Sequence, residues 1–161
     1  MKVLDMSAGN RAIWIEKEWP DAVFVDCRYS VHPNVVCDSR QLPFPNGIFD
    51  LVVFDPPHEN FGKNGKCSKL YGWHTTEEIK DIVKCSSREA WRVTKPNSLM
   101  LLKWNDHGQR LGKILEIVGA PWLALLGHKV SAKQWTNADG SLRGSSTFWV
   151  ALLRQELAQN S

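Results

Sequence analysis

Two consecutive prolines, Pro56 and Pro57, end the apolar run Leu51–Phe54 abruptly. Proline has no backbone N–H and a fixed φ, so a central strand cannot continue through this pair. The run therefore predicts a buried strand that leaves its sheet at the carboxyl edge, with Asp55 exposed there. Ligands of open α/β sheets bind at that edge, so the sequence predicts a binding site around Asp55.

The motif also predicts what such a site would hold. The Asp55 carboxylate and the Pro56 carbonyl are hydrogen-bond acceptors on neighbouring residues. Two acceptors held side by side suit a planar –NH2 group, which presents two N–H donors. The motif thus indicates a site that grips an amino group.

The rest of the chain predicts an α/β fold. Apolar runs of strand length that end in polar or acidic residues alternate with segments of helical periodicity. Strands are expected at Val3–Met6, Ala22–Asp26, Val35–Asp38, Leu51–Phe54 and Ser98–Trp104. Helices are expected at Arg11–Glu18, from an N-cap at Thr75 or Thr76 to about Val93, and at Gly108–Val118. The late segments Trp122–Val130 and Thr147–Leu153 are interpreted as an antiparallel hairpin. Residues 27–34 and 39–49 leave little room for crossover helices, so one face of the mostly parallel sheet should carry few of them.

Composition sets wide bounds. The 161 residues predict a single domain, 1–161, without a separate target-recognition domain. The sequence contains no apolar run of ~18 residues, so no membrane-spanning helix is predicted. The early acidic residue Asp5 argues against a signal peptide. Four cysteines without a C-x-x-C pair favour free thiols in the cytoplasm. The net charge of +3 permits a polyanionic partner, and the spacing of His58, Cys67 and His74 matches no common zinc pattern, so no metal site is expected.

Three predicted strands carry an aspartate at or next to their carboxyl ends, namely Asp5, Asp26 and Asp38. Asp5 precedes the small residues Ser7-Ala8-Gly9, a turn that a ligand could approach closely. Asp26 follows Asp5 by 21 residues, an offset at which an acidic residue often binds ribose hydroxyls. Asp38 could accept a hydrogen bond from an adenine amino group. Together they predict a nucleoside-like pocket.

These motifs, in this order, resemble the class I S-adenosylmethionine-dependent methyltransferases. The likeness runs over about residues 2–104 and includes Leu42-Pro43-Phe44-Pro45 and Arg92-Val93-Thr94-Lys95-Pro96-Asn97. The chain looks most like small, single-domain enzymes of phages and prophages, which carry Asp-Pro-Pro-His and a Lys-Trp pair after the fifth strand, here Lys103-Trp104.

The resemblance implies a Rossmann-like sheet, S-adenosylmethionine as cofactor and S-adenosylhomocysteine as product. It assigns Asp5 and Gly9 to the methionine part, Asp26 to the ribose, and Asp38 with Ser39 to the adenine. The implied cofactor-binding residues are Asp5, Met6, Ser7, Gly9, Asp26, Asp38, Ser39 and Asp55. The implied catalytic residues are Asp55, Pro56, Pro57 and His58, with His58 stacking on the target base.

The implied reaction is methyl transfer to an exocyclic amine of a nucleobase, with adenine N6 in DNA first and cytosine N4 next. The alternatives are guanine N2 in RNA, a free nucleotide, a protein side chain, or a non-catalytic subunit that binds cofactor or nucleic acid. The segment between His58 and His74 mixes lysines with aromatic residues, which suits phosphates and stacked bases but also a lid. Predicted substrate-binding residues are Lys63, Lys66, Lys69, Tyr71, Trp73, Lys103 and Trp104. The expected partner is nucleic acid, DNA before RNA, with a possible protein partner for target recognition.

Overall fold

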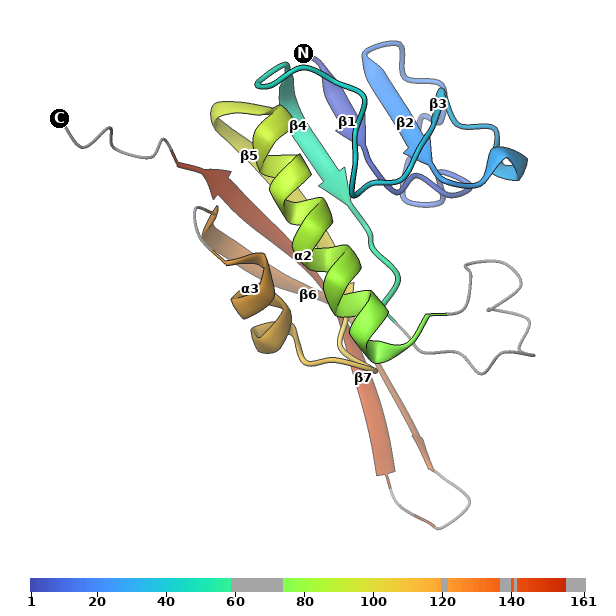
Figure 1. Cartoon of the computed structure of the whole chain (residues 1–161). Coiled ribbons are helices and arrows are strands. Elements are labelled where there is room, and N and C mark those ends of the chain that lie inside the picture. The colour runs from blue at the N-terminus through green and yellow to red at the C-terminus, as the bar shows by residue number, and fades with distance from the viewer. Residues whose placement is uncertain (59–73, 120–121, 137–139, 141, 156–161) are drawn as a thin grey trace, which may run out of the picture.

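The computed structural model describes residues 1–58, 74–119, 122–136, 140 and 142–155. Within them a seven-stranded sheet has the strand order β3-β2-β1-β4-β5-β7-β6 (Figure 1). The strands are β1 Val3–Asp5, β2 Ala22–Asp26, β3 Val35–Val36, β4 Phe49–Phe54, β5 Thr94–Asn105, β6 Trp122–Thr136 and β7 Leu142–Arg154. The helices are α2, Thr76–Val93, and α3, Leu111–Val118, and one 3-10 turn spans Tyr29–Val31.

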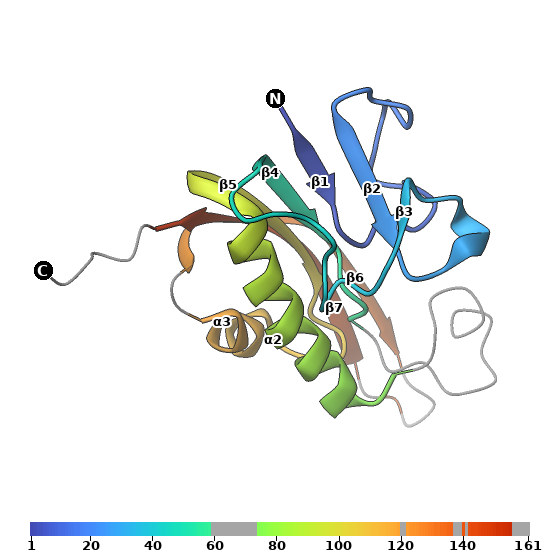
Figure 2. The same cartoon turned by 45° about the horizontal axis from the view of Figure 1, so that its top comes forward.

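The sheet is parallel from β3 to β5, as predicted. β7 lies between β5 and β6 and pairs antiparallel with both, so the predicted terminal hairpin is confirmed. Its strands are longer than the sequence suggested. From β1 the chain moves outward to β2 and β3, then returns to lay β4 on the other side of β1 (Figure 2). This reversal makes β1 and β4 the topological switch point, where open α/β sheets bind ligands.

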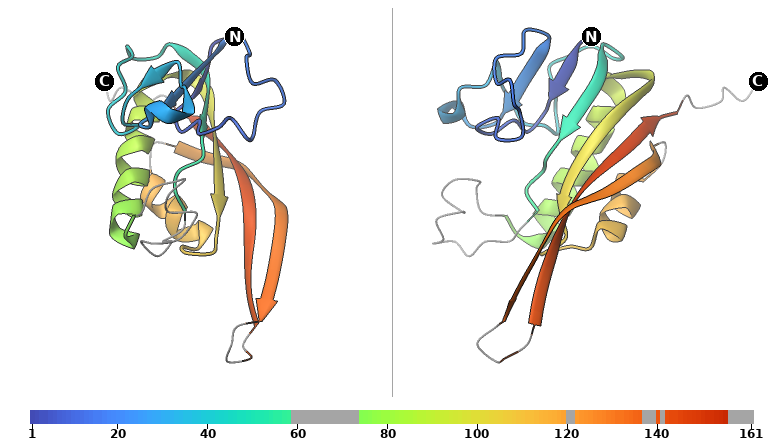
Figure 3. Two further views of the ribbon diagram at one scale, coloured as in Figure 1. Left: turned by 90° about the vertical axis from the view of Figure 1, so that its right-hand side faces the viewer. Right: turned by 180° about the vertical axis from the view of Figure 1, so that it is seen from behind.

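Both described helices cover one face of the sheet (Figure 3). The larger core lies beneath them and includes Leu4, Val52, Phe54 and Met100, all buried. Alternate residues of the same strands face the other side, where a smaller cluster contains Val3, Ala8, Ala22, Phe24 and Val53. The prediction of few helices on one face is confirmed for the described residues.

Helix α2 follows its sequence signals closely. Thr75 is the N-cap, and its hydroxyl accepts a hydrogen bond from the Glu78 N–H while the Glu78 carboxylate accepts one from the Thr75 N–H. This capping box satisfies donors that the first turn leaves unpaired. Ile79, Val83 and Ala90 form its buried stripe against the sheet.

The helix predicted for Arg11–Glu18 is absent, and turns and bends replace it. Arg11 has a φ of 54°, outside the right-handed helical region. Its guanidinium donates to the carbonyls of Lys17 and His32 and to the Glu18 carboxylate. Ile15, expected on the buried side of a helix, is fully exposed. Contacts to residues distant in sequence thus override the local apolar pattern.

The fifth strand, expected at Ser98–Trp104, is longer in the structure, and β5 also includes Lys95-Pro96-Asn97. Phe49 pairs with Thr94, whereas Leu51 pairs with Leu99, so several residues of β5 lie opposite Asp50. Asn97 has a φ of 57°, which allows the chain to bend there without leaving the sheet.

One arginine ties the segment before β4 to α2. The Arg92 guanidinium donates to the carbonyls of Leu42 and Phe44, to the Asn46 side chain and to both carboxylate oxygens of Glu89. A planar guanidinium can make these bonds at once because its five N–H donors form a fixed fork. No helix among the described residues is long and apolar enough to span a bilayer.

Candidate active site

A cavity of about 480 Å³ opens at the switch point, beyond the carboxyl ends of β1 to β4. Its volume lies in the range of small-molecule sites. Its wall brings together the turn after β1, the ends of β2 and β3, the Asp-Pro-Pro-His motif, part of α2 and the end of β5. The predicted site residues that line it are Met6, Ser7, Gly9, Asp26, Asp38, Ser39, Asp55, Pro56, Pro57, His58 and Lys103.

A hydrogen bond joins the β1 turn to the motif after β4. The Asp55 N–H donates to the Ser7 hydroxyl over 2.8 Å, linking segments 48 residues apart in sequence. The Ser7 N–H in turn donates to Asp5 Oδ1 at 3.2 Å. Ser7 therefore fixes where the acidic motif sits relative to the small-residue turn.

Asp5 does not line the cavity, contrary to the expectation that it would contact the methionine part of a cofactor. Its side chain is fully buried behind the turn, and Asp5 Oδ2 accepts a hydrogen bond from Trp14 Nε1 at 2.7 Å. Burial raises the pKa of the Asp5 carboxyl to about 6, against the lowering effect of Trp14 and Ser7. Asp5 supports the turn from behind.

Asp26 lies at the cavity wall with its carboxylate already engaged. Asp26 Oδ2 accepts a hydrogen bond from the Gly9 N–H at 2.9 Å, where Gly9 has a positive φ of 51°. The Arg28 guanidinium binds both carboxylate oxygens. Burial alone would raise the Asp26 pKa, but the hydrogen bonds and charge of Arg28 outweigh it, so this pKa lies below its usual value.

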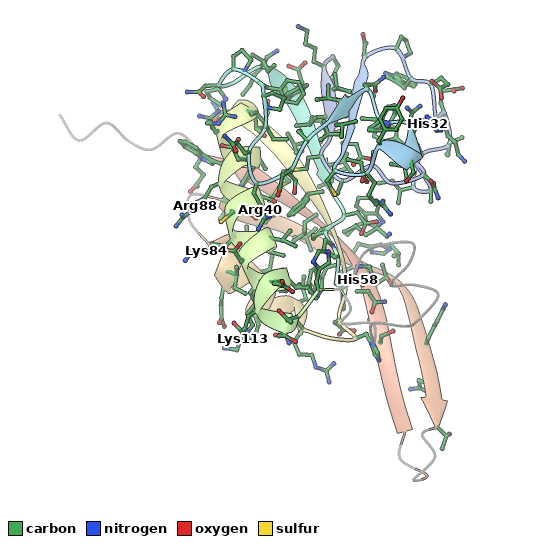
Figure 4. All side chains as sticks on the ribbon, turned by 45° about the vertical axis from the view of Figure 1, so that its right-hand side comes forward. His32, Arg40, His58, Lys84, Arg88 and Lys113 are labelled. Carbon is green, nitrogen blue, oxygen red and sulfur yellow. The ribbon has the colours of Figure 1, made fainter. Side chains whose placement is uncertain are left out.

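Asp38 repeats this arrangement at the end of β3. The Arg40 guanidinium donates to both Asp38 oxygens, and hydrogen bonding to Arg40 lowers the Asp38 pKa. Arg40 also reaches Asp81 on α2 at 3.2 Å (Figure 4). Ser39 shares a hydrogen bond with Ser86 of α2 at 2.8 Å. The adenine end of the predicted pocket is thus held between β3 and α2.

The Asp55 carboxylate has one occupied and one free oxygen. Lys103 Nζ, from the end of β5, lies 2.6 Å from Asp55 Oδ2. Asp55 Oδ1 is buried and has no hydrogen-bond partner among the described residues. Since a buried acceptor without a partner is costly, Oδ1 is the position in this wall best suited to an incoming donor.

His58 completes the motif. Its Nδ1 lies 3.2 Å from the Pro56 carbonyl oxygen and 3.9 Å from Asp55 Oδ1. Trp104, predicted to contact substrate, is fully buried in the core instead, and its Nε1 donates to the Gln109 carbonyl. The Trp104 ring packs edge-on to the His58 imidazole at 6.0 Å between centroids. Trp104 therefore supports His58 from the core side.

Sequence reasoning missed two arginines and two cysteines in the cavity wall: Arg28, Arg40, Cys27 and Cys37. The arginines had a readable signal, because each follows its aspartate by two residues, as Asp26-Cys27-Arg28 and Asp38-Ser39-Arg40. The predicted substrate-binding residues Lys63, Lys66, Lys69, Tyr71 and Trp73 lie outside the described residues, as does Cys67. Among the described residues no three potential metal ligands gather.

No protein-family model matches this chain, and no curated protein matches its sequence. Solved structures match its fold. A SAM-dependent methyltransferase from Methanosarcina mazei gives a TM-score of 0.61 at 12% identity, over 97% of this chain and 93% of that one. The N-methyltransferase NodS from Bradyrhizobium japonicum WM9 gives 0.60 at 11% identity, over 96% and 86%.

The [4+2]-cyclase SpnF gives a TM-score of 0.55 at 16% identity, over 81% of this chain and 54% of its own. The chain therefore has the Rossmann-like fold of class I methyltransferases. At least one protein with a matching fold is named for a different reaction, a [4+2] cyclisation. Fold alone does not decide the reaction, so the reaction must be argued from the cavity.

Proposed function

We propose that this protein is an S-adenosylmethionine-dependent methyltransferase that acts on an exocyclic amino group of a nucleobase. One observation carries the proposal: a single cavity joins Asp26 at the end of β2 and Asp38 beyond β3 to the Asp55-Pro56-Pro57-His58 motif. One end offers acceptors for a nucleoside, and the other offers acceptors for an amine. The likeness to solved methyltransferases supports the cofactor.

The cavity fits the cofactor in size and donor set. Gly9, with its positive φ, brings backbone close to the space that a methionine chain would occupy. Asp26 would bind the ribose hydroxyls and Asp38 with Ser39 the adenine edge. Because Arg28 and Arg40 occupy those carboxylates, the nucleoside must share or replace their hydrogen bonds. When bound, the cofactor supplies a methyl group activated by a sulfonium centre.

The acceptor end would orient the amine. An amine attached to an aromatic ring is a poor nucleophile because its lone pair is delocalised into the ring. Asp55 Oδ1 would accept one N–H and the Pro56 carbonyl the other, which favours a pyramidal nitrogen with its lone pair directed at the methyl group. Lys103 holds the Oδ2 side of the carboxylate, so Asp55 keeps one orientation. Such orientation and charge stabilisation are the main sources of rate here.

The proposed transfer is direct and needs no covalent intermediate with the enzyme. The lone pair of the amine nitrogen would form the N–CH3 bond while the S–CH3 bond of the bound cofactor would break, its electron pair remaining on sulfur. The nitrogen then loses one proton, which Asp55 Oδ1 is placed to accept. The His58 ring, backed by Trp104, would stack on the base.

Adenine N6 in DNA is the proposed acceptor, with cytosine N4 next. Support comes from the Asp-Pro-Pro-His motif, which resembles that of enzymes acting on base amines. Guanine N2 in RNA, a free nucleotide and a protein side chain are other amine acceptors. A subunit that only binds cofactor or nucleic acid is the remaining alternative.

The test is methyl transfer from labelled S-adenosylmethionine to single- and double-stranded DNA, RNA, nucleotides and protein extract. Asp55→Ala should lose at least about 100-fold in transfer while keeping cofactor affinity within a few-fold. Asp50→Ala is the matched control, since Asp50 lies at the far end of β4 and pairs with Lys95. Label in DNA that Asp55→Ala loses supports the proposal. Label only in another acceptor, or cofactor binding without transfer, would overturn it.

A further inference from the structure

β6 and β7 continue well past the end of β5. The last β5 pair with β7 is Asn105 with Thr147, and Thr147 also pairs with Ser131 of β6. Five further β6–β7 pairs follow, ending at Thr136 with Leu142. At about 3.3 Å per residue they extend the pair by roughly 17 Å. We call residues 129–136 with 142–148 the distal ribbon (Figure 3).

The distal ribbon leaves the sheet at the edge that carries the active site. β5 ends at Asn105, two residues after Lys103, which lines the cavity and pairs with Asp55. Asp106 binds Ser146 through two hydrogen bonds, so the ribbon is fixed to the end of β5 at its base. A partner held along the ribbon would therefore lie next to the cavity.

The distal ribbon is mainly basic. Its two strands contain Lys129, Lys133 and Arg143 and no acidic residue, and the residues that join them contain one acid, Asp139. Lys129 and Lys133 are exposed on the ribbon, as is His128 at its base. Such a surface attracts a polyanion, because phosphate contacts release condensed counterions.

Among the described residues, neither α2 nor α3 lies over the distal ribbon (Figure 3). On its β6 strand the side chains of Val130, Gln134 and Thr136 are exposed. On its β7 strand Phe148, at the base, packs against the core. A two-stranded hairpin without a covering layer is at best marginally stable in water. Burial against the described part of the chain does not account for the ribbon's length, whereas contact with a partner would.

We propose that the distal ribbon docks in the major groove of duplex DNA and holds the duplex beside the cavity. This proposal rests on the proposed function, in which the acceptor is a DNA base. The B-form major groove admits a two-stranded ribbon, and Lys129 and Lys133 supply contacts to the flanking phosphates. The A-form major groove of duplex RNA is too deep and narrow to admit one, so the geometry selects DNA.

The experiment compares wild type, Lys129→Ala/Lys133→Ala and the control Lys84→Ala/Lys113→Ala, which removes two exposed lysines from α2 and α3 (Figure 4). Binding to duplex DNA and duplex RNA is measured against salt concentration. The ribbon variant should bind duplex DNA about tenfold or more weakly at low salt, with a salt slope shallower by about 2. The control should keep the wild-type slope, and thermal unfolding should show that both variants are folded.

A second measurement separates this inference from the proposed function. Methyl transfer to a short single-stranded oligonucleotide should be unchanged in the ribbon variant, since the cavity is intact. If wild type methylates DNA but the ribbon variant binds duplex DNA normally, the ribbon proposal fails and the function stands. An equal loss in the control, or an equal loss on duplex RNA, also overturns groove docking. If wild type transfers label to no nucleic acid, the proposed function itself fails.

Discussion

Lys103 Nζ lies 2.6 Å from Asp55 Oδ2, so the carboxylate of the Asp-Pro-Pro motif already has a cation partner within the chain. The two residues come from adjacent parallel strands, β5 and β4, and both side chains are about three-quarters buried. The other carboxylate oxygen, Asp55 Oδ1, has no hydrogen-bond partner among the described residues. Lys103 was expected to contact substrate, and its position makes it first a positioning residue for Asp55.

Lys103→Ala should lower kcat by about 10- to 100-fold, because the Asp55 carboxylate loses the contact that fixes its orientation. Lys103→Arg, which keeps a cation, should recover part of the loss. The measurement is kcat together with the KM for S-adenosylmethionine and the KM for the nucleic acid. An unchanged kcat with a raised KM for nucleic acid would instead indicate that Lys103 binds the substrate directly.

Asp5 should make stability depend on pH in a distinctive direction. Its pKa is raised from 3.8 to about 6, so the folded state holds its proton more tightly than the unfolded chain. The stabilisation is fully present below about pH 4 and is lost as pH rises through 6, by roughly 3 kcal/mol in all. Urea unfolding of wild type and Asp5→Asn between pH 4 and 7 measures it.

The free energy of unfolding of wild type relative to Asp5→Asn should fall across that window. The exposed Asp21→Asn is the matched control, since it removes the same charge at the surface. A difference between wild type and Asp5→Asn that stays constant with pH would show that Asp5 is not held protonated in the fold.

Cysteine chemistry should report on the cofactor end of the cavity. Desolvation raises the pKa of both the Cys27 and the Cys37 thiol above its usual value, so both side chains are almost entirely in the less reactive thiol form at pH 7. The alkylation rate of Cys27 and Cys37 should therefore be low at pH 7 and rise about tenfold per pH unit until the thiol pKa is reached. Bound S-adenosylhomocysteine should lower this rate further. Mass spectrometry of the alkylated sites measures this.

The experiment uses a Cys67→Ser variant, so that Cys27, Cys37 and Cys85 are the remaining cysteines. Cys85 is the control, because it lies on α2 and does not line the cavity. Alkylation at Cys27 or Cys37 should abolish cofactor binding, while modification of Cys85 should leave it unchanged. Equal protection of all three sites by S-adenosylhomocysteine would contradict this placement of the cofactor.

Arg92→Ala should destabilise the fold by about 2–4 kcal/mol, because several buried or half-buried acceptors lose their donor at once. Arg92→Lys should be intermediate, since an ammonium cannot reproduce the planar fork. Chemical unfolding measures both variants. Arg88→Ala, on the exposed side of the same helix, should cost less than about 0.5 kcal/mol, and a similar loss there would refute the role given to Arg92.

Local signals predicted the fold where local interactions decide it. The cap at Thr75 and the stripe of α2 lie within one helix, and the strand cores are short apolar runs. The prediction of a helix at Arg11–Glu18 was wrong because contacts such as that of Arg11 with the carbonyl of His32, 21 residues away, decide the backbone there. The continuation of β6 and β7 also escaped prediction, because most of their distal residues are polar or small and carry no alternating apolar pattern.

The candidate site was predictable as a set of strand ends and less so as a set of contacts. Strand ends meet at one edge by topology, which placed Asp26, Asp38 and Asp55 around one cavity. Whether a side chain faces that cavity depends on register. Asp5 and Trp104 both end up in the interior, Asp5 beneath Trp14 and Trp104 beneath His58.

The absence of a helix at residues 11–18 has a consequence for how this molecule opens. Among the described residues, the face of β1 and β2 away from α2 is covered by an irregular segment. Side-chain contacts hold this segment, including those of Arg11 with Glu18 and His32 and that of Trp14 with Asp5. Such regions open at low free-energy cost, ahead of helix-covered strands. Amide hydrogen exchange should be fastest in this half, and a bound nucleoside would slow it there first, coupling ligand occupancy to the folding of half the sheet.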